Sequence, residues 1–239
     1  KMIRSIDEVY QLIKEEAPKK VAVAQAADAH VLHAIEGAHS EGYADAILIG
    51  SAEKIKKIEA EEGIYLTPYE IVDVEDEQQA AATAVKIVHE KKADVVMKGL
   101  MGSSTFLRDV QNREYGLRKK DSIISAIAVV ELEKVKKLNF ITDLAITPLP
   151  DLDTKIKILN NAVETAHKFG IEIPKVAALS AAETLNKKMA SSCDGAELET
   201  MNKLGKITGC EGAGPISFDL AMSEEAAVEK GYENPVAGK

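Results

Sequence analysis

Short apolar runs alternate with segments of helical periodicity along the first hundred residues of the chain. Four runs have the length and aliphatic content of buried strands, and they lie at 21–24, 46–50, 69–72 and 95–97. The helical segments that follow the first three runs open on polar residues suited to an N-cap, namely Asp28, Ser51 and Asp76. Another amphipathic helix is predicted over 5–17. With a helix also expected after residue 103, the order predicts a parallel sheet with helices on both faces.

The pattern changes after Arg118. Two apolar runs, at 122–132 and 138–142, have no helical segment between them and are joined by a charged turn, which predicts a hairpin-like pair of strands. The elements predicted downstream are a helix over 153–169, a strand over 176–179, a helix over 197–204, the start of a strand at 207–210 and a helix over 220–231. We therefore predict a two-domain α/β fold, with one α/β domain over 1–120 and a second over 121–239.

The segment Asp94–Arg108, DVVMKGLMGSSTFLR, is the strongest candidate for a binding site. Its apolar strand ends at Lys98, the chain turns at Gly99, and the next helix begins at the hydroxyl residues Ser103, Ser104 and Thr105. Free N–H groups and the positive end of the helix dipole converge at such a turn, which favours an anion. Lys98 and Arg108 add cations where a phosphate group would lie. The alternative is an ordinary turn with a Ser/Thr N-cap and two solvated basic residues.

Composition restricts the partners of the chain. Its 239 residues carry a net charge of −9, which disfavours nucleic acid and anionic membranes, although a local basic patch still suits a small phosphorylated ligand. Aromatic residues make up only 4% and Trp is absent, which argues against a base-stacking platform. The N-terminus reads as a helix start rather than a signal peptide, and no apolar run reaches membrane-spanning length. We therefore expect a cytoplasmic protein without nucleic-acid or membrane partners.

The residues that usually carry covalent or metal chemistry form no motif here. Cys193 and Cys210 stand in separate segments, which indicates small thiols in a reducing compartment. The five histidines have no ligand spacing, and no GxSxG elbow or Cys–His arrangement is present. We expect neither a metal nor a nucleophile supplied by the protein.

Seven motifs occur in a fixed order along the whole chain: VAVAQAADAHVL, DVVMKGL, STFLR, REYGLR, FITD, KVAALSAAETLNKKM and GPISFD. In order and spacing the chain resembles the phosphotransacetylase/phosphotransbutyrylase family of phosphate acyltransferases, and most of all its butyryl-transferring branch. The resemblance implies the reaction acyl-CoA + phosphate ⇌ acyl phosphate + CoA, with a short straight or branched acyl group. It implies direct attack of phosphate on the thioester, with CoA as a substrate and without a permanently bound cofactor.

The resemblance also implies a three-dimensional arrangement. The family is similar in fold to the isocitrate/isopropylmalate dehydrogenases, with two α/β domains around an interdomain cleft, and it forms homodimers or larger homo-oligomers. The alternatives are a phosphate acetyltransferase, a relative acting on acyl-ACP or as a metal-dependent dehydrogenase, and a non-catalytic protein that binds CoA or a phosphorylated metabolite. Clustered aspartates for a metal and a nucleotide loop are not evident, which counts against the dehydrogenase.

Several residues match the family's functional segments. The resemblance assigns five of them to the phosphate or acyl-phosphate end of the cleft and to the CoA phosphates: Lys98, Gly99, Ser104, Thr105 and Arg108. Arg118 matches the arginine of the family's YGLR, and the alternative is an exposed residue between domains. Asp143 matches a family acid that orients a ligand or a cation, and the alternative is a cap of the following turn. Glu183 and Asn186 match the family's AVE..N.

Two features depart from the family. In the family pattern GxxxDGPLxFD, Ala213 stands in place of the Asp, while Glu211 and Gly212 replace apolar residues and are expected to weaken a buried strand. Gly214 and Pro215 remain as substrate-binding candidates. The family's C-terminal Ser-Arg…Asp segment, which the resemblance makes responsible for transition-state stabilisation and for the CoA thiol proton, has no counterpart here. We expect the natural protein to continue and that continuation to complete the N-terminal domain, because the final NPVAGK leaves a sheet edge uncovered.

Overall fold

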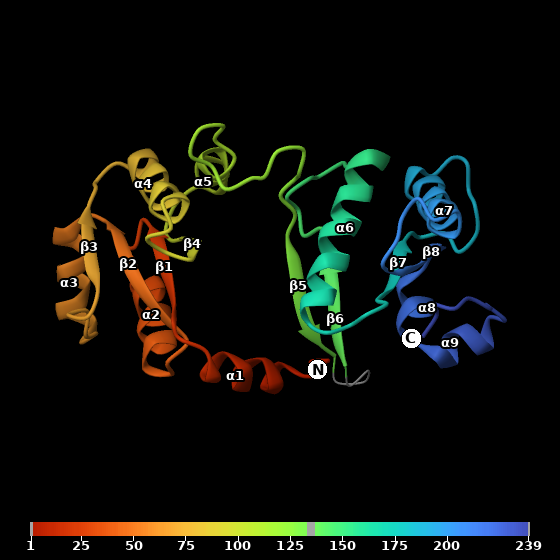
Figure 1. Cartoon of the computed structure of the whole chain (residues 1–239), viewed down its shortest axis with the longest axis horizontal. Coiled ribbons are helices and arrows are strands. Elements are labelled where there is room, and N and C mark those ends of the chain that lie inside the picture. The colour runs from red at the N-terminus through yellow and green to blue at the C-terminus, as the bar shows by residue number, and fades with distance from the viewer. Residues whose placement is uncertain (1, 133–136, 239) are drawn as a thin grey trace. The chain divides into compact units, whose positions relative to one another are not determined.

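The computed structural model describes residues 2–132 and 137–238 (Figure 1). The chain divides into an N-terminal unit, Val9–Asp121, and a C-terminal unit, Ser122–Lys239 together with Lys1–Glu8. The helices are α1 (Ile6–Glu15), α2 (Ala29–Ser40), α3 (Ala52–Glu62), α4 (Glu77–His89), α5 (Ser103–Val110), α6 (Leu152–Lys168), α7 (Ala190–Lys203), α8 (Phe218–Met222) and α9 (Glu224–Glu229). The strands are β1 (Lys19–Ala24), β2 (Ala44–Gly50), β3 (Glu70–Asp73), β4 (Val95–Lys98), β5 (Ile127–Glu131), β6 (Leu138–Thr142), β7 (Lys175–Leu179) and β8 (Glu211–Ile216).

The N-terminal unit is built on one parallel sheet in the order β3-β2-β1-β4. The two central strands are buried on both faces, as the near-continuous apolar runs in their sequences require. Val23 and Leu48 pack on one face against Leu32 of α2 and Ile55 of α3. The opposite face, made by the alternate residues of the same strands, packs against α4. The predicted parallel sheet with helices on both faces is therefore confirmed for this unit.

Polar residues at the ends of the strands determine where these helices begin. The side chains of the three predicted N-caps, Asp28, Ser51 and Asp76, each accept a hydrogen bond from an N–H in the first turn of the helix that follows. Gly63 ends α3 in the left-handed conformation, with φ of 65°. The carboxyl ends of the parallel strands and the starts of their helices consequently lie along one edge of the sheet.

The C-terminal unit contains two small sheets. β5 and β6 pair antiparallel, which confirms the predicted strand pair, although residues 133–136 of their connection lie outside the described residues. The first strand is shorter than predicted, because residues 122–126 are not in a strand and only Ile127–Glu131 pair with β6. β7 and β8 pair in parallel, and α7 packs against them.

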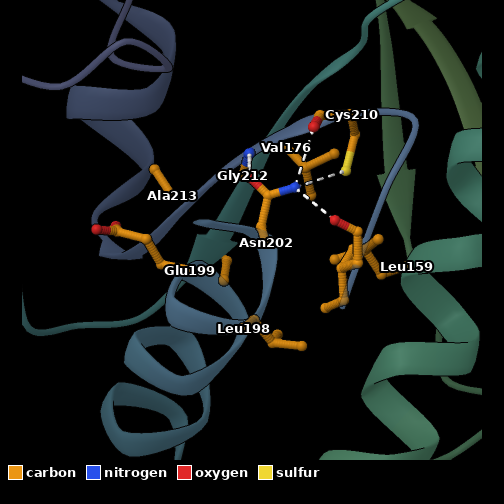
Figure 2. A pocket seen from close by; sticks show the side chains of 10 residues that line it. Leu159, Val176, Leu198, Glu199, Asn202, Cys210, Gly212 and Ala213 are labelled. Atoms are coloured by element: carbon orange, nitrogen blue, oxygen red, sulfur yellow. Dashed lines mark hydrogen bonds between the residues drawn. The ribbon is translucent and has the colours of Figure 1, made fainter. Parts of the chain in front are cut away.

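The prediction of a strand starting at 207–210 was wrong, because β8 begins at Glu211. The carboxamide of Asn202 on α7 donates to the carbonyl oxygens of Ile207 and Cys210, so these carbonyls face a helix instead of a neighbouring strand (Figure 2). Glu211 and Gly212 do not prevent the strand. The carboxylate of Glu211 pairs with Lys175, its neighbour in β7, and the N–H of Gly212 donates to Asn202.

Two helices differ from their predicted bounds. α7 begins at Ala190 rather than at 197, although its first half contains Ser, Asp and Gly, which have low helix propensity. Tertiary contacts stabilise that half, since Ser192 is fully buried and its hydroxyl bonds to both Thr184 and Asn186. The single helix predicted over 220–231 is divided into α8 and α9, because Ser223 is extended and caps α9.

Candidate functional site

The turn between β4 and α5 runs along the carboxyl end of β1. The N–H of Gly99 donates to the carbonyl of Ala24 at 2.8 Å, and the next N–H donates to the carbonyl of Gln25 at 3.0 Å. A Cβ atom added at Gly99 would lie 2.1 Å from the Gln25 carbonyl oxygen. Only glycine fits this close approach of two backbones, so Gly99 has a packing role whether or not it also contacts a ligand.

The start of α5 presents backbone donors to solvent. Its N-cap residue, Gly102, has no side chain with which to cap the helix. Ser103 and Ser104 are exposed and Thr105 is half-buried. Among the residues that the structure describes, the N–H groups of these three residues have no hydrogen-bond partner. Because these are the donors at the positive end of a helix, the α5 start has the electrostatics of an anion site.

The two cations assigned to this region differ in their surroundings. The ammonium group of Lys98 donates hydrogen bonds to two carbonyl oxygens of the turn, those of Gly99 at 3.4 Å and Met101 at 3.0 Å. Arg108 is exposed, and within 2–132 and 137–238 its guanidinium makes no hydrogen bond or ion pair. Arg108 follows Ser104 and Thr105 by four and three residues, so it lies on the same face of α5 as these two residues.

A carboxylate that sequence reasoning missed also lies at this helix start. The Oε1 atom of Glu77, the first residue of α4, accepts the N–H of Gly102 at 2.9 Å. The signal in the sequence was an acidic residue directly after the predicted N-cap Asp76, which is typical of any helix first turn. Nothing in that pattern indicated that its side chain would reach a different helix.

A second acid, Asp109, is buried at the other end of α5. Its side chain is 4% exposed, and its Oδ1 accepts the hydroxyl of Tyr115 at 2.6 Å. This hydrogen bond, followed by burial, raises the pKa of Tyr115 above its usual value. Lys86 of α4 lies 4.7 Å from the centre of the Tyr115 ring. The hydrogen bond between Asp109 and Tyr115 joins the end of α5 to the turn that leads to Arg118. Arg118 is exposed and lies near the end of the N-terminal unit.

Asp143 uses its carboxylate to hold backbone. Its Oδ1 accepts the N–H of Ala126 and its Oδ2 accepts the N–H of Thr147, both at 2.8 Å. The preceding residue, Thr142, donates its hydroxyl to the carbonyl of Ala126 at 2.8 Å. This is the turn-capping arrangement that the sequence offered as the alternative to a ligand contact.

Gly214 and Pro215 are buried, which differs from the expectation of two residues presented to a substrate. A Cβ atom at Gly214 would lie 2.7 Å from the carbonyl oxygen of Gly195, and Pro215 packs against the same glycine of α7. The N–H of Gly214 donates to Glu199 at 2.9 Å. The structure therefore gives both residues a packing role between β8 and α7.

The matched residue Glu183 belongs to an ion cluster. The ammonium group of Lys230 lies 2.6 Å from Glu183 and 2.9 Å from Asp219. The hydroxyl of Ser217, and then Lys230, lower the pKa of Asp219 to about 2. The pKa of Glu183 is lowered as well, chiefly by Lys230. Asn186 caps its own loop by accepting the N–H of Lys188.

Neither of two cavities formed by described residues is lined by a predicted site residue. One of about 10 Å³ lies between α7 and β8, beside Leu198, Glu199 and Asn202 (Figure 2), and it has room for about one water molecule. A larger groove of about 390 Å³ is lined by the end of α1 and Tyr43. Among the described residues no cluster of three potential metal ligands is found, and no described helix has the length and apolar content to cross a membrane.

Comparison with known proteins gives a consistent family. A family model described as phosphate acetyl/butaryl transferase matches residues 4–86 and 77–239. The chain is 46% identical over 238 residues to a phosphate butyryltransferase of Clostridium acetobutylicum, and this match covers 100% of the chain and 79% of the relative. It is 42% identical over 238 residues to a phosphate butyryltransferase of Clostridium beijerinckii, with coverage of 100% and 78%.

A solved structure agrees with these matches. The crystal structure of a branched-chain phosphotransacylase from Enterococcus faecalis V583 superposes with a TM-score of 0.78 at 32% sequence identity, covering 92% of this chain and 76% of that one. The family model spans all of the residues that carry the motifs quoted above, including the β4–α5 turn. The chain therefore belongs to the phosphate acetyl/butyryl transferase family.

Proposed function

We propose that this chain catalyses acyl transfer between CoA and phosphate, acyl-CoA + phosphate ⇌ acyl phosphate + CoA, with butyryl or a branched short-chain acyl group. The observation that carries this proposal is the 46% identity to a phosphate butyryltransferase over the full length of the chain. The family description includes both acetyl and butyryl transferases, so phosphate acetyltransferase is the alternative within the same reaction.

The β4–α5 turn supports the proposal as the place where a phosphate group binds. The amides of Ser103, Ser104 and Thr105 form a set of donors that no described residue occupies, and Arg108 lies one turn further along the same face of α5. Bringing phosphate and CoA together requires cations and N–H donors, because both substrates are anionic. Lys98 contributes positive charge while it also bonds to the carbonyls of the turn.

The chemistry needs no covalent intermediate on the protein. An oxygen of hydrogen phosphate attacks the thioester carbonyl and the carbon–sulfur bond breaks. The proton that hydrogen phosphate loses balances the one that the leaving CoA thiolate takes up. In this step the residues of the β4–α5 turn bind and orient the phosphate group and reduce its repulsion from CoA. Arg118 is proposed to contact the same substrates. Asp143 is proposed to cap the turn after β6 and not to act on the substrates, since both of its carboxylate oxygens accept backbone N–H groups.

The finer features of the fold belong to the same proposal. We expect the two units to form the two lobes of an isocitrate/isopropylmalate dehydrogenase-like arrangement, with substrates bound in the cleft between them. We also expect a homodimer or larger homo-oligomer located in the cytoplasm. Size-exclusion chromatography with light scattering measures the oligomeric state directly.

A thiol-release assay tests the proposed reaction. The chain is incubated with butyryl-CoA, and free CoA is measured with and without phosphate. We expect CoA release that depends on phosphate, and a faster reaction with butyryl-CoA or isobutyryl-CoA than with acetyl-CoA. Tight binding of butyryl-CoA without phosphate-dependent turnover would instead identify a binding protein of this fold.

A further inference from the structure

We infer that the carboxylate of Glu77 has two opposing effects at the start of α5. It holds the β4–α5 turn in place by accepting a hydrogen bond, and its negative charge weakens the binding of a phosphate group there. The inference rests on the proposed function, because it assumes that a phosphate group of one substrate binds at the β4–α5 turn. The inference concerns how tightly that phosphate group binds. It assigns a positioning role to Glu77, a residue outside the family motifs quoted above.

The contact is direct. The Oε1 atom of Glu77 lies 2.9 Å from the N–H nitrogen of Gly102, immediately before the three amides that lack partners. Consecutive N–H groups at a helix start point toward the same space, so a phosphate group bound to Ser103–Thr105 lies next to this carboxylate. Glu77 is exposed to solvent.

The other helices at this edge of the sheet are capped differently. α2 and α4 take their caps from the residue just before the helix, Asp28 and Asp76. α3 is capped by Ser51, and its first N–H also donates to Asp73 at 2.9 Å. α5 has a glycine at that position and takes a carboxylate from a neighbouring helix instead. Losing Glu77 therefore leaves α4 capped and affects the start of α5.

The expected size of the effect is that of the repulsion between two neighbouring like charges exposed to water. Two like charges about 4 Å apart in water repel each other by roughly 1 kcal/mol, which is about a fivefold difference in affinity. Glu77→Gln removes the charge but keeps an oxygen that can accept the N–H of Gly102. Glu77→Ala removes both the charge and the acceptor, so the turn loses its support.

The test compares the full-length wild type with Glu77→Gln, Glu77→Ala and a matched control, Glu53→Gln. Glu53 is an exposed carboxylate in the first turn of α3 at the same edge of the sheet. Michaelis constants (KM) are measured separately for phosphate and for butyryl-CoA. Thermal unfolding is measured in parallel with inorganic phosphate or CoA as the titrated ligand.

We expect Glu77→Gln to lower one of the two KM values about threefold to fivefold, with kcat nearly unchanged. A lower KM for phosphate identifies inorganic phosphate as the anion at α5, and a lower KM for butyryl-CoA identifies the phosphates of CoA. Glu77→Ala should lose this gain, which separates support of the turn from loss of charge. If Glu77→Gln matches Glu53→Gln for both substrates, the inference is overturned.

The proposed function can fail separately. If the wild type shows no phosphate-dependent turnover, the thermal titrations still test Glu77. In that case stabilisation of Glu77→Gln at lower phosphate or CoA concentration than wild type supports the inference, and identical titrations reject it. If Glu77→Ala does not fold, Glu77→Gln against Glu53→Gln decides the question.

Discussion

The strand ends of the two units use similar sequences in opposite ways. β4 is followed by a glycine-containing turn and then α5, whereas β8 has its glycine inside the strand and leads through Ser217 directly into α8. In each case the glycine excludes any larger residue, Gly99 after β4 and Gly214 within β8. At the end of β4, the first amides of α5 have no hydrogen-bond partner among the described residues, and the guanidinium of Arg108 makes no hydrogen bond or ion pair with them. Near the end of β8, Gly214 and Pro215 are buried, and the N–H of Gly214 donates to Glu199 of α7.

This difference distinguishes a glycine beside a binding site from a glycine that serves packing, which the sequence motifs alone do not. A glycine-rich turn indicates only that the backbone approaches something closely. At β8 the close neighbour is another helix, and the polar groups nearby form ion pairs within the unit, as in the Lys230 cluster. At β4 the close neighbour is the β1 backbone, which positions the turn and leaves the donors of the following helix available for a ligand.

The largest expected effect concerns the glycine at the exposed turn. Gly99→Ala places a Cβ atom 2.1 Å from a backbone carbonyl that cannot move away easily, so we expect a loss of about 3 kcal/mol or more in the free energy of unfolding. Urea unfolding measures it. The matched control is Gly102→Ala, whose Cβ atom would meet only side-chain atoms at 3.4 and 3.7 Å. Equal destabilisation by the two substitutions would contradict the role assigned to Gly99.

A substitution of Asp143 tests whether this residue, at the end of β6 in the C-terminal unit, stabilises the fold without taking part in catalysis. Asp143→Asn replaces one of two carboxylate oxygens that accept backbone N–H groups, so we expect a loss of about 1–3 kcal/mol in the free energy of unfolding. The reference is Asp153→Asn, an exposed acid in the first turn of α6. A capping role predicts that kcat of the folded variant stays within about twofold of wild type. A much larger fall in kcat with unchanged stability would assign Asp143 to catalysis.

A substitution of Arg108 tests whether the β4–α5 turn binds a phosphate group. Arg108→Ala should raise the KM for phosphate or for acyl-CoA more than tenfold, a loss of more than about 1.4 kcal/mol in binding, because a cation beside the phosphate group is removed. Arg113→Ala, which removes an exposed arginine from the turn after α5, is the control and should leave both constants unchanged. Unchanged kinetics in well-folded Arg108→Ala would remove Arg108 from the site.

The smallest effect is expected in the ion cluster of the C-terminal unit. The pKa of Asp219 is lowered to about 2, so its contribution to stability is present above its ordinary pKa of 3.8 and is lost as pH falls through about 2. Lys230→Met removes one cause of the lowered pKa. The melting temperature of this variant should therefore depend less on pH between about 4 and 2 than that of wild type. Lys187→Met, an exposed lysine outside the cluster, is the control, and identical pH profiles for the two variants would contradict the prediction.

The local features of the N-terminal unit were predictable because they depend on near neighbours in the sequence. The N-caps Asp28, Ser51 and Asp76 bond to groups three residues away, so their residue types and positions were sufficient. The downstream strand start was mispredicted at 207–210 because its backbone bonds depend on Asn202, a side chain on another element. The start of α7 was missed for the same reason, since Ser192 is satisfied by groups of a preceding loop.

By itself the sequence determined the alternation of strands and helices, the caps of the early helices and the family to which the chain belongs, because periodicity and motif order are properties of the linear chain. Only the tertiary structure decided that Glu77 of α4 lies at the start of α5, that Gly214 packs against Gly195, and that both oxygens of Asp143 hold backbone. These facts concern the direction and neighbours of side chains, which depend on how separate elements pack and which no local pattern encodes.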